Sequence, residues 1–217
     1  MRVPNASASG AKTKDANGSR YWYFDGRLHR EDGPAIEGPL GFQEGYWQGE
    51  GHREDGPAII DHKGGKQWWV DGQRHRDNGP AIEQSDGSKQ WWVHGYLHRI
   101  GAPAVDLVDG TKEWWCCGKL HREDGPAIVY QNTQEWWVHG KRHREDGPAV
   151  ENQNGDHQWW LDGQQCCQEE FLQLVSIRRK QLLDREIDNI CNRGTVTPVS
   201  CLKSLSIRKR RLGSNAP

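Results

Sequence analysis

The sequence has few of the residues from which a deep globular core is built. Its 217 residues include three Phe and one Met, hydrophobic residues make up 34%, and the mean hydropathy is −0.98. It also lacks a stretch approaching the roughly 20 apolar residues of a membrane span, and its first 20 residues contain no apolar signal region. We therefore expect a protein that is neither membrane-embedded nor secreted, with a thin β-sheet in place of a round globule.

The spacing of the Cys residues lacks the usual signs of a metal site. Four of the six Cys form two adjacent pairs, Cys116-Cys117 and Cys166-Cys167, and an adjacent pair closes a disulfide ring only with strain. No C-x-x-C or H-x-x-x-H spacing accompanies them. We therefore expect free thiols, a neutral role for Cys116-Cys117 within a strand, and no metal or other cofactor.

What the sequence does have is one phrase copied six times. His-Arg-Glu-Asp-Gly-Pro-Ala, or a variant of it, begins at six His residues that are 23, 23, 23, 23 and 22 residues apart. A fixed period of this length is the signature of a repeat protein, in which each unit contacts only its neighbours. The six positions are His29, His52, His75, His98, His121 and His143.

All 12 Trp residues follow the same period. Four Trp pairs begin seven residues before a phrase, a fifth opens a final unit that lacks the His, and Trp22-Tyr23 and Tyr46-Trp47 take the same place in the first two units. The five pairs are Trp68-Trp69, Trp91-Trp92, Trp114-Trp115, Trp136-Trp137 and Trp159-Trp160.

Two rows of Trp follow from this pattern, because neighbouring residues of a strand point to opposite faces of a sheet. A one-layer sheet cannot bury both rows, so we expect one to form the core and the other an exposed strip for binding or self-association. In one repeat, we expect Trp92 to pack between units and Trp91 to make the contacts. The alternative is that the C-terminal segment or Arg and Lys side chains cover the second row.

Turn signals divide each unit into strands. In the unit at 66–86, Asp71-Gly72 indicates a type I′ hairpin turn, Asn78-Gly79-Pro80 a bulge or kink, and Asp86-Gly87 the turn into the next unit. The predicted fold is mainly β: an elongated, single-layer antiparallel β-meander of about six 23-residue hairpin repeats, with a C-terminal helical cap.

The His-Arg-acid cluster resembles catalytic residues, but a catalytic site is needed once and this cluster occurs six times. The fourth unit, with Ile100-Gly101, has neither acid. We therefore predict structural roles and no enzyme activity. Asp124 and its equivalents are expected to accept backbone N–H groups at the Gly-Pro turn, and Arg122 and its equivalents to pair with carboxylates of the adjacent unit. The His should fill a half-buried position with its ring bonded to the main chain.

Three regions are expected: a flexible segment at 1–19, the array at 20–165, and a C-terminal helix with a basic tail at 166–217. Residues 1–163 carry 19 Lys and Arg against 25 Asp and Glu, whereas 164–217 carry 10 against 5. Residues 169–190 lack Gly and Pro and have apolar residues at helical spacing, which predicts one helix. The cluster Arg208–Arg211 indicates a nuclear address, a phosphate contact or a solvated tail.

The pattern Trp-x-x-Gly-x-x-His, as in Trp69 to His75 and Trp137 to His143, resembles the MORN repeat. It is still more similar to divergent MORN-like arrays of phage and giant-virus proteins that read Trp-Trp-Val-x-Gly-x-x-His-Arg-x-Asp-Gly-Pro-Ala. The resemblance covers 20–165 and implies an elongated β-meander used for binding, without catalysis. The doubled Trp and the Asp-Gly-Pro-Ala depart from ordinary MORN units, and the acidic array opposes attraction to anionic membranes.

These features predict a viral or phage-type repeat protein that acts in the host cytoplasm, or in the nucleus through Arg208–Arg211. Its expected function is a protein–protein interaction scaffold, through self-association or as an inhibitor of a host factor. The alternative is a sponge that sequesters a nucleotide-like small molecule by Trp stacking and Arg or His contacts. Neither a membrane nor a nucleic acid is an expected partner. The candidate binding residues are Trp68, Trp91, Trp114, Trp136, Trp159, Arg76, Arg99 and Arg122.

Overall fold

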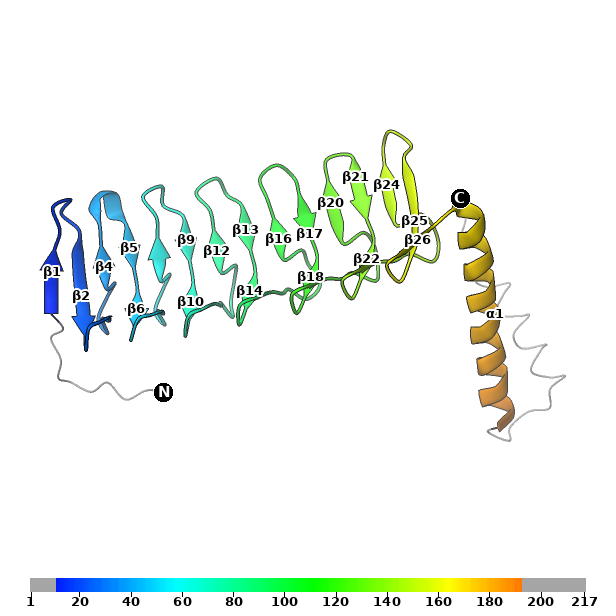
Figure 1. Ribbon diagram of the computed structural model, residues 1–217, viewed down its shortest axis with the longest axis horizontal. Coiled ribbons are helices and arrows are strands. Elements are labelled where there is room, and N and C mark those ends of the chain that lie inside the picture. The colour runs from blue at the N-terminus through cyan, green and yellow to red at the C-terminus, as the bar shows by residue number, and fades with distance from the viewer. Residues whose placement is uncertain (1–10, 193–217) are drawn as a thin grey trace. The chain divides into compact units, whose positions relative to one another are not determined.

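The computed structural model describes residues 11–192 of the chain, which divides into two units, Met1–Gln165 and Cys166–Pro217 (Figure 1). The first unit consists of β-hairpins that follow one another in chain order, and the second contains one helix. The prediction of a mainly β chain with an antiparallel meander and a C-terminal helix is therefore confirmed. Over residues 11–192, no helix has the length and apolar character needed to cross a membrane.

The main sheet has 16 strands, which pair antiparallel in chain order except that β3 pairs back on β2. Its strands are β1 (Ala11–Lys14), β2 (Arg20–Phe24), β3 (Arg27–Leu28), β4 (Ile36–Glu37), β5 (Gln43–Glu44), β8 (Ile59–Ile60), β9 (Lys66–Gln67), β12 (Ile82–Glu83), β13 (Lys89–Gln90), β16 (Val105–Asp106), β17 (Lys112–Glu113), β20 (Ile128–Tyr130), β21 (Thr133–Glu135), β24 (Val150–Asn152), β25 (His157–Leu161) and β26 (Gln164–Cys166). A 3-10 helix, η1 (Pro39–Gly41), lies between β4 and β5.

Five small hairpins extend the repeats of the array beside this sheet (Figure 1). Each has two short antiparallel strands joined by a tight turn. They are β6 (Tyr46–Trp47) with β7 (Glu50–Gly51), β10 (Trp69–Val70) with β11 (Gln73–Arg74), β14 (Trp92–Val93) with β15 (Tyr96–Leu97), β18 (Trp115–Cys116) with β19 (Lys119–Leu120), and β22 (Trp137–Val138) with β23 (Lys141–Arg142).

Each repeat is one long hairpin from which a loop of six residues projects. In the third repeat β9 pairs with β12 and β10 pairs with β11, so 75–80 is left outside both ladders. Trp68 connects the two ladders, because its N–H donates to the carbonyl of Ala81 at 2.8 Å and its carbonyl accepts from the N–H of His75 at 3.1 Å. The interruption predicted at Asn78-Gly79-Pro80 is thus the far end of a longer loop.

The two turn predictions are confirmed by the backbone angles. Asp71 and Gly72 both have positive φ, 47° and 72°, as a type I′ turn requires. Gly87 has φ 95° in the turn that joins β12 to β13. These turns keep successive strands antiparallel and set the period of the array.

The core of the array is thin and is lined mainly by the Ala of the repeated phrase. Six Ala residues are at most 1% exposed, and each one immediately precedes a strand of the sheet. Ile82, Val105 and Val150, which follow three of them, are also buried. This explains the low overall hydropathy, since each repeat buries few large aliphatic side chains. The Ala residues are Ala35, Ala58, Ala81, Ala104, Ala127 and Ala149.

Two details of the array differ from the sequence prediction. In the second repeat Gly45 makes the backbone bond to Ala58 that Trp68 makes to Ala81, so Tyr46 corresponds to Trp69 and Trp47 to Val70. Trp47 is therefore displaced by one position from the other Trp residues. The sheet also begins earlier than expected, because β1 lies within the segment 1–19 and pairs with β2.

The predicted helix is observed as α1 (Gln168–Asn192), with Glu169 and Glu170 in its first turn. Acidic side chains there interact favourably with the helix dipole. Phe171 and Val175 are buried, whereas several other apolar residues of α1 are exposed: Leu172, Leu174, Ile177 and Leu182. The stretch at 199–212, including Arg208–Arg211, lies outside the described residues.

Candidate binding site

The His-Arg step of each phrase joins one repeat to the next. In the third repeat, the N–H of Arg76 donates to the carbonyl of Trp92 in the fourth repeat at 3.3 Å. Nδ1 of His75 accepts a hydrogen bond from the backbone N–H of His94, in the turn of the fourth repeat, at 3.2 Å. The same ring-to-backbone bond occurs at all six repeats, at 3.1–3.2 Å. The expected half-buried His, bonded to the main chain, is confirmed.

The Arg of the phrase folds back over the first Trp of its own repeat. In five repeats the guanidinium carbon lies 3.7–4.2 Å from the centre of the indole ring, a cation–π contact. We call this set the Trp–Arg ladder. Its pairs are Trp22–Arg30, Trp68–Arg76, Trp91–Arg99, Trp114–Arg122 and Trp136–Arg144.

The Gly of the phrase makes room for this folded Arg. A Cβ atom on Gly79 would lie 3.1 Å from the guanidinium carbon of Arg76, and one on Gly147 would lie 2.9 Å from that of Arg144. The Arg also donates from Nη1 to the carbonyl of the Pro in its own loop, as Arg76 does to Pro80 at 3.0 Å. In these repeats Gly and Pro of the phrase help to hold the guanidinium on the indole, and in the fourth repeat, where Ala102 replaces the Gly, Arg99 keeps the same contact with Trp91 at 3.7 Å.

The carboxylates around the Arg belong to the same repeat, which corrects two predictions. Asp124 accepts a hydrogen bond from Nε of Arg122 at 2.8 Å and its side chain is 84% exposed, so it does not accept buried turn amides. Arg144 pairs with Asp146 and Glu151 of its own phrase and strand, and not with the adjacent unit. The six-residue loop is short enough that the Arg reaches these acids before it reaches the next repeat.

Arg99 differs from the other Arg residues of the ladder. Ile100 and Gly101 replace the acids of the phrase, and within residues 11–192 the guanidinium of Arg99 bonds only to the carbonyl of Pro103, at 3.1 Å, while stacking on Trp91. Among residues 11–192, no carboxylate forms an ion pair with this guanidinium. Arg99 also borders a cleft of about 410 Å³ together with Trp114 and Arg122.

The second Trp of each pair packs between repeats. Arg74 lies 5.0 Å from the ring centre of Trp69 in its own repeat and 5.2 Å from that of Trp92 in the next. The indole N–H donates to the Gln or Glu two residues earlier, as Trp92 does to Gln90 at 3.1 Å. The expectation that Trp92 packs between units agrees with this geometry.

Both Trp rows are half-buried, so neither is a core row nor a fully exposed strip. This corrects the expected division. Its physical reason is that Arg residues cover one face of the first Trp, while Arg74 and Arg142 also lie between the second Trp residues of two pairs of neighbouring repeats. The alternative in which Arg side chains cover Trp is the one that the contacts favour. Trp159, in β25, is half-buried too, and its unit lacks the phrase that would supply an Arg.

The structure brings the candidate residues together as separate Trp–Arg pairs repeated along the array. Arg144 and the pair Trp22–Arg30 belong to the same ladder but were not among the predicted binding residues. The signal that could have found them is the constant separation of eight residues between the first Trp and the Arg. A second cluster, formed by His98, Cys116 and Cys117 of neighbouring repeats, was also not predicted.

Two clefts of the array differ in what they offer a ligand. The larger, of about 620 Å³, is lined by turn and strand residues of both charges, among them Asp61, Lys66, Glu83 and Asp86. The smaller one is lined by Trp114 of the ladder and by the guanidinium groups of Arg99 and Arg122. Aromatic and Arg side chains are the residues most enriched at interaction sites. The ladder side of the array is therefore the better candidate site.

Comparison with known protein families finds no family model that matches this chain, and comparison with curated proteins finds no matching protein.

We expect Trp91→Ala and Trp92→Ala to destabilise the array by similar amounts. Both indoles are half-buried, so each change should lower the free energy of unfolding by about 2 kcal/mol, roughly half the 3–5 kcal/mol cost at a fully buried Trp. Chemical denaturation of the two variants measures this difference. A neutral effect of Trp91→Ala beside a full cost for Trp92→Ala would restore the division into a core row and an exposed strip.

The stability of the array should also fall with acid through its Arg–Asp pairs. The hydrogen bond and the charge of Arg122 lower the pKa of Asp124. Since the folded-state pKa lies below the unfolded one, the pair stabilises the fold above the ordinary pKa of Asp, and this contribution disappears as the pH falls through the folded value. NMR titration of the carboxyl carbon should show the lowered pKa in the native chain and an ordinary one in Arg122→Gln. An ordinary pKa in the native chain would contradict the pairing.

Proposed function

We propose that the array is a non-enzymatic, MORN-like scaffold that binds a protein partner through its Trp–Arg ladder. The observation that carries the proposal is the repetition of one half-buried indole and one guanidinium in five of the six repeats. Such residues dominate the binding energy of protein interfaces, because they combine a large apolar area with several hydrogen-bond donors. A repeated surface also gives a partner many weak contacts that add up.

The indole N–H groups of the ladder support this proposal. In the described part of the chain, Trp68, Trp91, Trp114 and Trp136 donate no indole hydrogen bond, whereas the second Trp of each pair does. Each such N–H can donate to a carbonyl of a bound chain. The two Trp of a pair thus have separate roles, one in holding repeats together and one in contact.

The period of the ladder favours an extended partner segment. Each repeat adds two strands to the sheet, and at about 4.8 Å per strand this places ladder pairs roughly 9.6 Å apart. Three residues of extended chain span about the same distance, at roughly 3.1–3.4 Å per residue. One pair could therefore contact every third residue of an extended segment.

The His residues support a scaffold in preference to an enzyme. At all six repeats the same ring nitrogen accepts the same type of backbone hydrogen bond from the following repeat. This common bond uses the His to hold the array together, whereas a general base needs its lone pair directed at a substrate. The viral or phage origin, the inhibition of a host factor and the site of action in the host cytoplasm or nucleus remain part of this proposal.

A second candidate function is binding of a nucleotide-like small molecule. The cleft beside Trp114 favours it, because it holds Arg99, which has no carboxylate partner among residues 11–192, together with Arg122. Its volume of about 410 Å³ suits a small ligand. Glu123 and Asp124 at the same cleft oppose an anionic ligand, and each ladder indole already has an Arg on one face. We therefore rank this function second.

Affinity capture with quantitative mass spectrometry should separate the two candidates. The ladder variant is Trp91→Leu/Arg99→Gln, and the control is Tyr96→Ser, which changes a 61% exposed residue of the same repeat. If the ladder binds a protein, that partner should be recovered with the native chain and the control, and its affinity for the ladder variant should fall about 30-fold or more, the loss expected for hot-spot residues.

Two results would contradict the leading proposal. One is recovery of the same partner equally by the native chain and the ladder variant. The other is a small molecule that copurifies with the native chain in native mass spectrometry and is lost from the ladder variant, which would establish the second candidate instead. The remaining possibility is self-association through the ladder. Light scattering tests it by measuring the molar mass of the native chain, the ladder variant and the control at several concentrations.

A further inference from the structure

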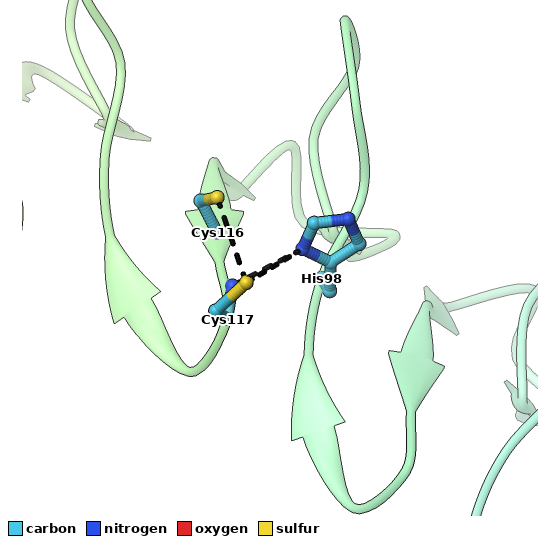
Figure 2. A group of neighbouring side chains, drawn as sticks. All are labelled: His98, Cys116 and Cys117. Carbon is cyan, nitrogen blue, oxygen red and sulfur yellow. Dashed lines mark hydrogen bonds between the residues drawn. The ribbon is translucent and has the colours of Figure 1, made fainter.

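His98, Cys116 and Cys117 form a compact cluster between the fourth and fifth repeats (Figure 2). Sγ of Cys116 lies 3.9 Å from Sγ of Cys117, which in turn lies 3.7 Å from Nδ1 of His98. All three atoms lie within 4.8 Å of one another, and both Cys residues are exposed. Figure 2 shows both thiols on one small hairpin beside the ring of His98, which directly follows the preceding small hairpin.

The hairpin turn is what brings two adjacent Cys side chains together. In a regular strand, neighbouring side chains point to opposite faces. Cys116 ends β18, but Cys117 is the first residue of the tight turn and has a left-handed backbone with φ 50°. This conformation turns its thiol to the side of Cys116. Both thiols are free, so they are available as ligands.

The surroundings of His98 distinguish it from the equivalent His residues. At the five other repeats Nε2 lies 3.2–3.9 Å from an acidic side chain two residues later. The residue two after His98 is Ile100, which offers no such contact. In the third, fourth and sixth repeats the positions of the two Cys are held by Val followed by Asp or His, as in Val70-Asp71 and Val93-His94. This junction alone among the repeats therefore combines a His with two soft sulfur ligands.

The distances match the edges of a metal-centred tetrahedron. Zn–S and Zn–N bonds of about 2.3 and 2.1 Å place neighbouring ligand atoms roughly 3.5–3.8 Å apart in tetrahedral geometry. The two measured edges, 3.9 Å and 3.7 Å, are close to this range, and the third, between Cys116 and His98, is at most 4.8 Å. We propose that His98, Cys116 and Cys117 bind a thiophilic metal ion of the zinc class.

Binding of the ion changes the protons and one hydrogen bond of the cluster. Each thiol releases its proton to solvent as its thiolate binds the metal. Nδ1 of His98 now accepts the backbone N–H of Cys117 at 3.1 Å, and its lone pair must leave this bond to coordinate the ion. Three protein ligands at an exposed position leave a fourth coordination place open, as in zinc sites that exchange a ligand. The ion would link two repeats across their junction.

The experiment uses the full chain with Cys166, Cys167, Cys191 and Cys201 each changed to Ser, so that only the pair at 116 and 117 can give a thiolate signal. Co²⁺ is the optical probe, since thiolate coordination produces a sulfur-to-cobalt charge-transfer band, and Zn²⁺ is then added in competition. A non-thiol reductant keeps the Cys residues reduced. We expect one Co²⁺ per chain with the charge-transfer band, displaced by Zn²⁺.

The matched variant is Cys116→Val/Cys117→Asp, which gives this repeat the residues that Val70-Asp71 supplies in another repeat and so should keep the fold. It should lose both the band and the bound ion while its circular dichroism stays unchanged. The reciprocal change, Val70→Cys/Asp71→Cys beside His52, should raise the stoichiometry to two ions per chain. Metal binding that persists in the Val-Asp variant, or a native chain that gives no charge-transfer band, would overturn the proposal.

Discussion

The array depends on the hydrogen bonds that each His-Arg step makes to the repeat that follows it. The His ring accepts a turn N–H and the Arg N–H donates to a Trp carbonyl, so one dipeptide fixes two points of the next hairpin. Because the core of each repeat is little more than an Ala and an aliphatic neighbour, burial alone would hold the hairpins weakly. Directional bonds at every junction therefore define how the thin sheet propagates.

The same step places the residues that we assign to binding. Once the backbone of the Arg is fixed to the next repeat, its side chain can fold back on the first Trp of its own repeat, as Arg76 does on Trp68, where Gly79 and Pro80 hold it. Cohesion between repeats and presentation of the Trp–Arg ladder thus come from one dipeptide. A partner that contacts several repeats would hold neighbouring repeats together across their junctions. Its binding should therefore stabilise the folded array.

The period, the turns and the helix could be predicted because they depend on local backbone chemistry: Asp71-Gly72 has the conformation that its residues favour, and α1 extends the predicted helix by one or two residues at each end. The burial of the Trp rows and the partner of Asp124 could not be predicted, because both depend on the direction in which a flexible Arg side chain folds. The cluster at His98 was missed for a related reason: its ligands come from two repeats and from a left-handed turn that reverses the strand alternation.

Amide hydrogen exchange tests the role of the His junctions most directly. The turn N–H groups that donate to His Nδ1 should be protected although they lie in exposed turns, whereas the N–H of Ser85, in the turn between β12 and β13, should exchange fast. Changing His121 to Leu should make the backbone N–H of His139 exchange fast and leave the turn N–H groups of the other junctions protected. Fast exchange at all six positions would contradict the account. The six donors are Gln48, Asp71, His94, Cys117, His139 and Asp162.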